Sequence, residues 1–371
     1  MTRNVLIDFD SSIGRYDGIS RATYDDANCL SRLDLTVNLW HSRRYKQLFN
    51  DDNPLYQIPN ISLDQTRPTN SKIWFKSFLN FKVDTPEADY IYLNSFFGFK
   101  PKNAIPILRL FDPFIFDYNP KFELRKQFRR LKNGVARNSR NSDFLKIQGQ
   151  SVHVYGSKIA AENFESFYGF APNRMAIIPC AVGETRDFVE KISFQSISER
   201  PYFLIIGGQR QRKNPIFAIN AWAKSPVSRK LNLRVVGRVP HHLLNSYAQS
   251  HLSSGSLVFH SEISQIELEE LVLKARALVY VMIKGDGFAR PIAEALISGT
   301  PIICNDLDIF REIAGSHASY FPSEDESSLI DLMWIYSDAP PISKNLSIWE
   351  YGKQFSYAAL SQKWMNIFLD S

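Results

Sequence analysis

The chain has 371 residues, of which 44% are hydrophobic and 22% are charged, and its formal net charge is +6. This composition is typical of a folded globular protein and excludes bulk disorder, and the length predicts two domains. Three cysteines lie far apart, without metal-ligand spacing and without an even set for disulfides, which favours a reducing compartment. The N-terminus has no signal-peptide pattern and no apolar run is long enough to span a bilayer, so we expect a cytoplasmic protein.

The first half of the chain alternates short β-branched or aromatic runs with helical patterns, which predicts a parallel sheet with crossover helices. The predicted strands are residues 5–9, 36–40, 90–93, 105–111, 152–155 and 175–179. A helix is predicted from about residue 19 to residue 32, whereas the Pro-, Asn- and Asp-rich residues 50–73 are predicted to be irregular. Residues 1–185 therefore form the first predicted domain, which is Rossmann-like.

Basic residues concentrate in the segment 121–146, which carries nine lysines and arginines against two acids. A solvated helix face is one interpretation of this segment. Contact with anionic lipid headgroups or a lipid-linked acceptor is a second, and it would place the protein peripherally at the inner face of a membrane. Nucleic-acid binding is a third interpretation, which the lack of regularly interleaved aromatic residues disfavours.

After a predicted linker at residues 186–200, the alternation restarts and predicts a second Rossmann-like domain over residues 201–352. Its predicted elements are strands 202–207, 232–236, 256–259, 277–283 and 301–304, and helices 215–225, 241–250, 264–275 and 291–298. The amphipathic residues 353–371 are predicted to form a helix that returns to the first domain. The predicted fold class is thus α/β, with two doubly wound domains facing a central cleft. In such sheets, ligands bind beyond the carboxyl ends of the strands.

One loop of the second domain, KGDGFARP at residues 284–291, joins an apolar strand to an apolar helix. Gly285 and Gly287 let the backbone approach a ligand or adopt positive φ. Pro291 suits the first helical turn, and the amides of that turn form a ready anion site. The loop therefore predicts a ligand that carries a phosphate or another anion.

Two acids accompany this loop, Asp286 within it and Glu294 one turn into the helix. Carboxylates accept hydrogen bonds, so both residues suit a ligand's hydroxyl groups, such as those of a sugar and a ribose. Arg290 and the backbone amides would then serve the phosphates. For Glu294 taken alone, an acid that offsets the helix dipole is an equally good interpretation.

A second loop, GGQRQRKNP at residues 207–215, also leaves a strand and enters a helix. Gly207 and Gly208 remove side chains from the turn. Arg212 and Lys213, beside a helix N-terminus, would neutralise a diphosphate. An exposed basic loop with no ligand is the alternative interpretation.

The order of these motifs resembles a known family, the retaining glycosyltransferases of family 4, which have the GT-B fold of two Rossmann-like domains. The resemblance is carried by IIGGQRQRKNPIFAINAWAKS, LRVVGRV, ISQIELEELVLKARALVYV, GDGFARPIAEALISGTPIICND and REIAGSHASYFPSEDESSLIDLM. The first half matches more loosely, through DGISRATYDDANCLSRL and VHVYGSKIAAENFESFYG. Each motif alone is a weak signal, whereas their shared order and spacing are specific.

The resemblance implies that the second domain binds a nucleotide-sugar donor and the first domain binds the acceptor. Asp286 would contact the transferred sugar, Glu294 would contact the nucleotide ribose, and Arg212 and Lys213 would hold the diphosphate. The remaining donor contacts implied by the resemblance are Gly207, Gly208, Gly287, Phe288, Ala289 and Arg290, with the base near Gly237 and His260.

On the acceptor side, Gly18 and Arg21 match the family's Gly-Ile-x-Arg helix entry. The chain departs from the family pattern at two positions. Asp286 stands where the family usually has Glu, and Phe111 precedes Asp112 where many members carry a His-Asp pair. Asp112 is retained as a candidate that binds the acceptor or stabilises developing charge.

The activity implied by the resemblance is retaining transfer of a hexose from GDP-mannose or a UDP-hexose to a glycan or lipid-linked glycan, in surface polysaccharide synthesis. We expect no metal and no other cofactor, because basic side chains and helix amides can stabilise the departing diphosphate. Two alternatives remain open: a catalytically silent nucleotide-sugar- or glycan-binding protein, and another GT-B activity such as DNA-base glucosylation.

Overall fold

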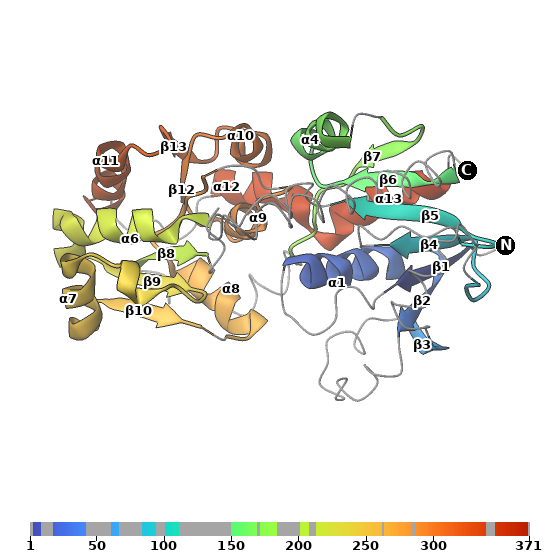
Figure 1. The fold of residues 1–371 in the computed structure, drawn as a ribbon, viewed down its shortest axis with the longest axis horizontal. Coiled ribbons are helices and arrows are strands. Elements are labelled where there is room, and N and C mark those ends of the chain that lie inside the picture. The colour runs from blue at the N-terminus through green and yellow to red at the C-terminus, as the bar shows by residue number, and fades with distance from the viewer. Residues whose placement is uncertain are drawn as a thin grey trace, which may run out of the picture. The chain divides into compact units, whose positions relative to one another are not determined.

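The computed structural model contains two compact units, which Figure 1 shows with their elements labelled. Unit 1 comprises Met1–Ala181 and Tyr357–Ser371, and unit 2 comprises Val182–Ser356. The structure describes residues 3–8, 18–41, 61–66, 84–93, 101–110, 150–168, 171–183, 201–207, 213–261, 263–283, 287–338 and 346–369. The predicted linker 186–200 and the basic segment 121–146 lie outside these ranges. No helix within them is long and apolar enough to cross a bilayer.

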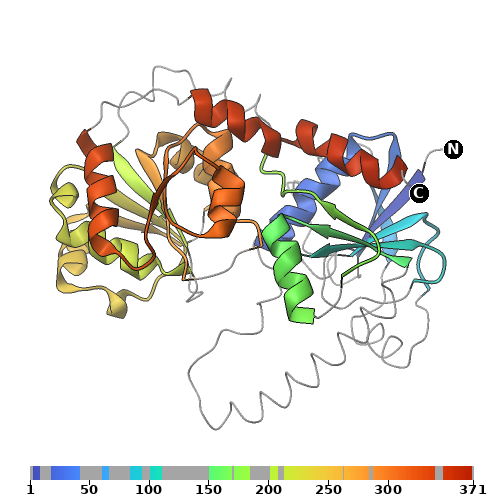
Figure 2. The ribbon, with the colours of Figure 1, turned by 90° about the horizontal axis from the view of Figure 1, so that it is seen from above.

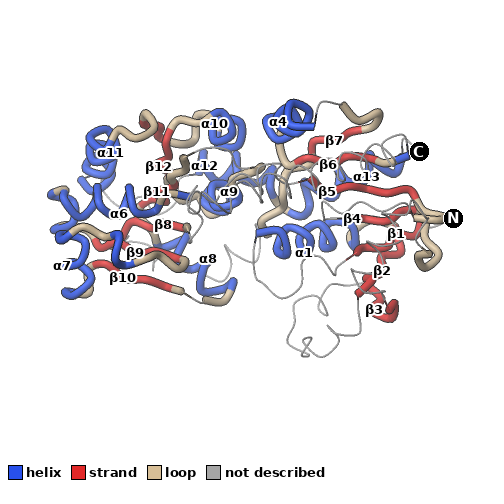
Figure 3. The backbone as a smooth tube through the Cα atoms, in the orientation of Figure 1, coloured by secondary structure: helices blue, strands red, loops and turns tan. Residues whose placement is uncertain are grey.

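Unit 1 is built on a parallel sheet in the order β3-β2-β1-β4-β5-β6-β7, whose strands are red in Figure 3. The strands are β1 (Arg3–Asp8), β2 (Leu35–His41), β3 (Ile61–Thr66), β4 (Tyr90–Leu93), β5 (Ile105–Leu110), β6 (Val152–Tyr155) and β7 (Met175–Ile177). Successive side chains of a strand point to opposite faces, so both faces of this sheet carry apolar residues. One face packs on α1 (Gly18–Ser31) and α13 (Tyr357–Leu369), and the other packs on α4 (Lys158–Tyr168).

The strand β3 lies inside residues 50–73, so the prediction that this stretch is irregular is wrong at this point. Its partner is β2, the neighbouring strand in the sheet order. A strand at this position is stabilised by main-chain pairing with a distant segment, which local composition does not show.

The last helix, α13, packs against α1 in unit 1, which confirms the prediction that the C-terminal helix returns to the body of the fold (Figure 2). Trp364 and Phe368 of α13 are buried in the same apolar core as the strands. The Tyr357 hydroxyl donates a hydrogen bond to Asp25 Oδ1 at 2.5 Å. Apolar burial and this polar contact together attach the end of the chain to unit 1.

Unit 2 is built on a parallel sheet in the order β10-β9-β8-β11-β12-β13. The strands are β8 (Tyr202–Ile206), β9 (Asn232–Val236), β10 (Leu257–His260), β11 (Ala277–Tyr280), β12 (Ile302–Asn305) and β13 (Ser319–Phe321). Counted from β8, this is the 3-2-1-4-5-6 order of the Rossmann fold. The strand order reverses between β8 and β11, which is the position where such sheets bind ligands.

Helices cover both faces of this sheet, as the view in Figure 2 shows. On one face lie α6 (Pro215–Lys224), α7 (Ser246–Ser254) and α11 (Glu326–Asp338), and on the other lie α8 (Gln265–Lys274), α9 (Arg290–Ile297), α10 (Asp308–Ala314) and α12 (Leu346–Gly352). The single helix predicted over 241–250 is wrong, because the chain forms a short 3-10 helix, η8 (His241–Leu243), before α7. Asn245 separates the two elements, since its side chain caps α7.

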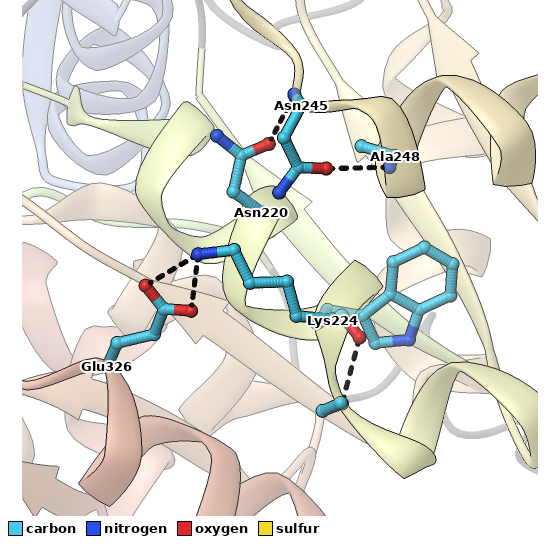
Figure 4. A network of polar contacts seen from close by, with 7 residues as sticks. Asn220, Lys224, Asn245, Ala248 and Glu326 are labelled. Atoms are coloured by element: carbon cyan, nitrogen blue, oxygen red, sulfur yellow. Dashed lines mark hydrogen bonds and ion pairs between the residues drawn. The ribbon is translucent and has the colours of Figure 1, made fainter.

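Polar contacts attach α6 to both of its helical neighbours (Figure 4). Asn220 Oδ1 accepts a hydrogen bond from the Asn245 backbone N–H at 3.1 Å, and Asn245 Oδ1 in turn accepts one from Ala248 N–H at 2.8 Å. Lys224 forms an ion pair with Glu326 of α11 at 3.0 Å. These contacts hold in place a helix whose first turn directly follows one of the two candidate loops.

Candidate functional site

The two loops predicted to carry the chemistry follow β8 and β11, the neighbouring strands between which the sheet order of unit 2 reverses. In the first loop the structure describes Gly207 and residues 213–215, and in the second it resumes at Gly287. Because all strands of this sheet are parallel, both loops emerge from the same carboxyl edge. The site predicted from the sequence therefore lies where the topology of a doubly wound sheet opens a ligand crevice.

Three predicted donor-side residues continue the sheet ladder at this edge. Gly207 N–H donates to Val236 O at 3.0 Å, and Gly237 N–H donates to His260 O at 2.8 Å. Gly207, Gly237 and His260 are thereby aligned at the ends of β8, β9 and β10. Gly237 has a φ of 119°, which lies in the left-handed region that favours glycine.

His260 is half-buried at the end of β10. Burial lowers the pKa of its imidazole, and the nearby Arg234 lowers that pKa further. The ring is therefore neutral near pH 7, with one nitrogen that donates and one that accepts a hydrogen bond. Such a group suits recognition of a nucleobase edge.

Lys213 extends from the β8 loop toward the end of β11. Its Nζ lies 5.8 Å from the centroid of the Tyr280 ring, and Tyr280 is the buried last residue of β11. Gly207 and Lys213 lie close together, since Lys213 O is 3.5 Å from the place that a Cβ at Gly207 would occupy. This arrangement brings the cation of one loop to the strand that leads into the other.

The entrance to α9 is buried and has an unusual backbone. Ala289, the N-cap residue, has φ 54° and ψ 52°, a left-handed conformation that disfavours any residue with a Cβ. Phe288 is 5% exposed and packs edge-on against Phe355 of the 3-10 helix η9 (Lys353–Phe355), with 5.7 Å between ring centroids. Ile292 N–H donates to Ala289 O at 2.9 Å and closes the first turn.

Glu294 and Arg290 form an ion pair on α9, with 2.9 Å between Arg290 Nε and Glu294 Oε1. The arginine side chain is 12% exposed and the glutamate side chain 8%. A charge-assisted hydrogen bond of this kind orients the carboxylate. The pair places one anionic acceptor and one cationic donor side by side at the start of the helix.

In unit 1, the structure places two predicted acceptor-side residues at the corresponding position. Gly18 begins α1, and the half-buried Arg21 lies in its first turn. The helix follows β1, which lies beside β4 where the order of the unit 1 sheet reverses. The predicted residues Gly208, Arg212, Asp286 and Asp112 lie outside the described residues.

Sequence reasoning missed two residues that support this site. Asn305, at the carboxyl end of β12, bonds to the main chain of Met282 just before the α9 loop. Gly352 ends α12, and a Cβ at that position would lie 2.5 Å from Ile297 N of α9. A polar residue that ends an apolar strand is a signal for the first, whereas no local pattern identifies the second.

Comparison with known proteins shows similarities in the second half of the chain. The family described as Glycosyl transferases group 1 matches residues 188–350. Serotype-specific mannosyltransferase WbdA of Escherichia coli is 28% identical over 171 residues, which are 43% of this chain and 21% of that protein. O-antigen chain mannosyltransferase RfbU of Salmonella typhimurium is 31% identical over 165 residues, or 43% of this chain and 44% of that protein. The chain thus spans less than half the length of these curated relatives.

Solved structures show the same fold over the whole chain. Anabaena Alr3699/HepE in complex with UDP-glucose aligns with a TM-score of 0.65 at 14% identity, covering 100% of both chains. WaaG, a glycosyltransferase involved in lipopolysaccharide biosynthesis, aligns with a TM-score of 0.64 at 15% identity, covering 98% of this chain and 99% of that one. Over residues 188–350 this chain is therefore similar to the glycosyl transferases group 1, and its fold is the GT-B fold.

Proposed function

We propose that the protein is a retaining glycosyltransferase that moves a hexose from a nucleotide-diphosphate sugar to a glycan or lipid-linked glycan during polysaccharide synthesis. One observation carries the proposal: in a domain similar to the glycosyl transferases group 1, Lys213 and the Arg290–Glu294 pair lie on the loops that flank the reversal of strand order. Contact of the basic residues 121–146 with an anionic membrane would bring the enzyme to a lipid-linked acceptor.

GDP-mannose is the first donor to test. The relatives matched over 43% of the chain are named mannosyltransferases, whereas the UDP-glucose complex belongs to a protein that is 14% identical. UDP-hexoses remain the second donor class. The neutral His260 and the glycine turn at Gly237 are the proposed contacts for the base, so these residues would discriminate between guanine and uracil.

In the proposed mechanism, the acceptor hydroxyl attacks the face of the sugar from which the phosphate leaves. Lys213 and Arg212 neutralise the departing diphosphate, together with the amides at the start of α9, and no metal ion is required. Glu294, held by Arg290, accepts hydrogen bonds from the ribose. Asp286 accepts hydrogen bonds from the hydroxyl groups of the transferred sugar. Activity is then expected to persist in EDTA.

The proposal is tested with Lys213→Ala and Glu294→Ala. Each is expected to lower kcat/KM by about a hundredfold or more, because Lys213 neutralises the departing diphosphate and Glu294 holds the ribose of the donor. The matched controls are Lys274→Ala and Glu270→Ala, which remove the same residue types from an exposed ion pair on α8. Near-wild-type rates in both site variants would refute the site assignment.

The donor is identified with a panel of GDP-, UDP- and ADP-sugars, measured by thermal shift and by nucleotide release. A ligand that binds only the folded state raises the melting temperature by mass action, so this measurement needs no acceptor. Binding without transfer or donor hydrolysis would instead indicate a catalytically silent binding protein. Failure to bind any nucleotide sugar would refute both functions.

A further inference from the structure

Asn305 ends β12, and its buried side-chain amide connects three neighbouring strands at the carboxyl edge of the unit 2 sheet. Its Oδ1 accepts the N–H of Met282, the second residue after β11, at 3.0 Å. Its Nδ2 donates to Met282 O at 2.9 Å and to the hydroxyl of Ser323, two residues after β13, at 2.8 Å. A flipped amide would set donor against donor and acceptor against acceptor, so the network permits one orientation.

These contacts replace main-chain pairing that has ended. The ladder between β11 and β12 runs to the pair Tyr280 and Cys304. Beyond it, the Asn305 amide makes the two hydrogen bonds to Met282 that a neighbouring strand would otherwise make. Met282 is 1% exposed, whereas the next residue, Ile283, is 46% exposed. Asn305 therefore anchors the last buried residue before the loop that leads to α9.

The other end of the same loop is anchored independently. Phe288 packs against Phe355, and Ala289 adopts the left-handed conformation that begins α9. Asn305 is the side chain that sets the β11 end.

We propose that Asn305 is a positioning residue for the donor: it acts through the backbone of Met282 and fixes the point at which the chain leaves β11 toward α9. The role in donor binding rests on the function proposed above, whereas the anchoring of Met282 does not. Asn305→Ala leaves a buried N–H and C=O of Met282 without their protein partner, so the backbone shifts or admits water.

The first test compares Asn305→Ala with Thr300→Val. Thr300 precedes β12 at its opposite end, is fully buried, and donates a side-chain hydrogen bond to Val272 O at 2.8 Å. The two variants thus each remove a buried side-chain hydrogen bond from the same part of the sheet. With GDP-mannose as the probe, Asn305→Ala is expected to raise the donor KM about tenfold or more with a smaller change in kcat. Thr300→Val is expected to keep the wild-type KM.

Hydrogen exchange of the intact protein supplies a readout that does not require activity. Asn305→Ala is expected to speed exchange in the peptide that contains the Met282 amide, and Thr300→Val is not. Unchanged exchange at Met282, or an equal rise in KM in both variants, would overturn the positioning role. A wild-type protein that binds no nucleotide sugar would overturn the proposed function and the role of Asn305 in donor binding. The hydrogen-exchange measurement would still test whether Asn305 anchors Met282.

Asn305→Asp separates positioning from general stability through its pH profile. The carboxylate can accept the Met282 N–H but repels Met282 O, whereas the protonated acid can both accept and donate, as the amide does. Burial favours the protonated form, so the donor KM relative to wild type is expected to rise as the pH increases from about 5 to about 8. The ratio to wild type cancels the titration of the nearby Asp306–Arg311 ion pair. A ratio that stays flat over this range would contradict the inference.

Discussion

The two units use charge in opposite ways. In unit 1, Arg109 of β5 and Asp26 of α1 form an ion pair with 2.9 Å between Nε and Oδ2, and both side chains are fully buried. In unit 2, Lys224 and Glu326 pair at the surface. The pair at the candidate site of unit 2, Arg290–Glu294, is largely buried, with side chains 12% and 8% exposed. The Arg109–Asp26 pair therefore links a strand and a helix inside the core of unit 1, whereas the Arg290–Glu294 pair lies within a single helix that follows β11.

The buried pair of unit 1 fixes the segment on which the chain leaves this unit. The Arg109 guanidinium donates to Ile178 O at 2.5 Å and to Pro179 O at 3.3 Å, and unit 1 ends at Ala181. Asp26 also accepts a hydrogen bond from the Tyr92 hydroxyl at 2.8 Å. Removing two charges from water is costly, so this network specifies the path of the chain more than it adds net stability.

Unit 2 fixes its functional helix by close backbone packing instead. Gly352 of α12 lies against the Leu296 carbonyl and Ile297 N of α9, with no room for a Cβ. Around these residues α9 is buried from Pro291 to Ile297. Close backbone packing thus fixes a helix in unit 2, whereas an ionic network fixes a chain segment in unit 1. Separate substitutions can disrupt the two kinds of contact.

The largest effect is expected from Arg109→Met, which leaves Asp26 buried without its cation. The free energy of unfolding should fall by about 3–5 kcal/mol, because a carboxyl left alone in an apolar core must either stay charged or bind a proton, and both cost free energy. Urea denaturation checks this value. The matched control, Lys224→Met, removes the cation of the exposed pair in unit 2 and should cost less than about 1 kcal/mol. Equal losses in the two variants would remove the contrast between the units.

Gly352→Ala should rank second. The added methyl group overlaps the backbone of α9, so the free energy of unfolding should fall by up to about 3 kcal/mol. Leu346→Ala on the same helix is the control, because Leu346 is 63% exposed and its truncation should change stability by about 0.5 kcal/mol or less. Thermal unfolding distinguishes the two. A Gly352→Ala protein as stable as wild type would show that α9 is not packed this closely.

The pH dependence of stability should also differ between the units. Burial raises the pKa of Asp26 to about 6, against the opposing effect of Arg109. The folded state then holds this proton more tightly than the unfolded chain does, so stability falls as the pH rises from about 4 to about 6, by about 2 kcal/mol. Asp26→Asn should lack this slope.

The opposite slope is expected from Asp325 in unit 2, where hydrogen bonds from Ser328 and Ser327 lower the carboxyl pKa to about 2. Its contribution is present above about pH 4 and is lost as the pH falls toward about 2. Unfolding titrations of Asp26→Asn and Asp325→Asn against wild type measure both slopes. Slopes of the same sign would contradict the assignment.

Ala289→Gly should give the smallest change, a gain of about 1 kcal/mol or less, because glycine adopts positive φ without strain. Glu324→Gly is the matched comparison in unit 2, since Glu324 has a φ of 66° at an exposed position. A gain at Glu324 but none at Ala289 would indicate that the buried methyl group of Ala289 offsets its backbone strain. Chemical denaturation resolves differences of this size when the variants are measured together.

Much of unit 2 could be predicted because its signals are local. The helix predicted from residue 264 begins with a capping box, in which the Ser264 hydroxyl accepts the Glu267 N–H and the Glu267 carboxylate accepts the Ser264 N–H. Two strand-to-helix loops also lie where the sequence predicted them. The first begins at Gly207, after β8, and the second ends at Ala289, before α9. The roles of Lys213 and Glu294 toward a donor stay predictions.

The features that sequence reasoning missed are nonlocal. Strand β3 depends on its pairing with β2, and the Asp26–Arg109 pair joins residues that are far apart in the sequence. The left-handed conformation of Ala289 was also missed, because the backbone conformation there is imposed by the packing around it. Composition and periodicity do not identify contact partners that are far apart in the sequence.

The sequence by itself determined the types of most elements and the loops of the candidate site, because apolar periodicity, glycine, proline and capping residues act over a few positions. Only the tertiary structure decided that α13 completes the core of unit 1, that Arg109 forms an ion pair with Asp26, and that Asn305 anchors Met282. Each of these depends on which segments become neighbours when the sheets form. A buried polar group must then find its partner among those neighbours.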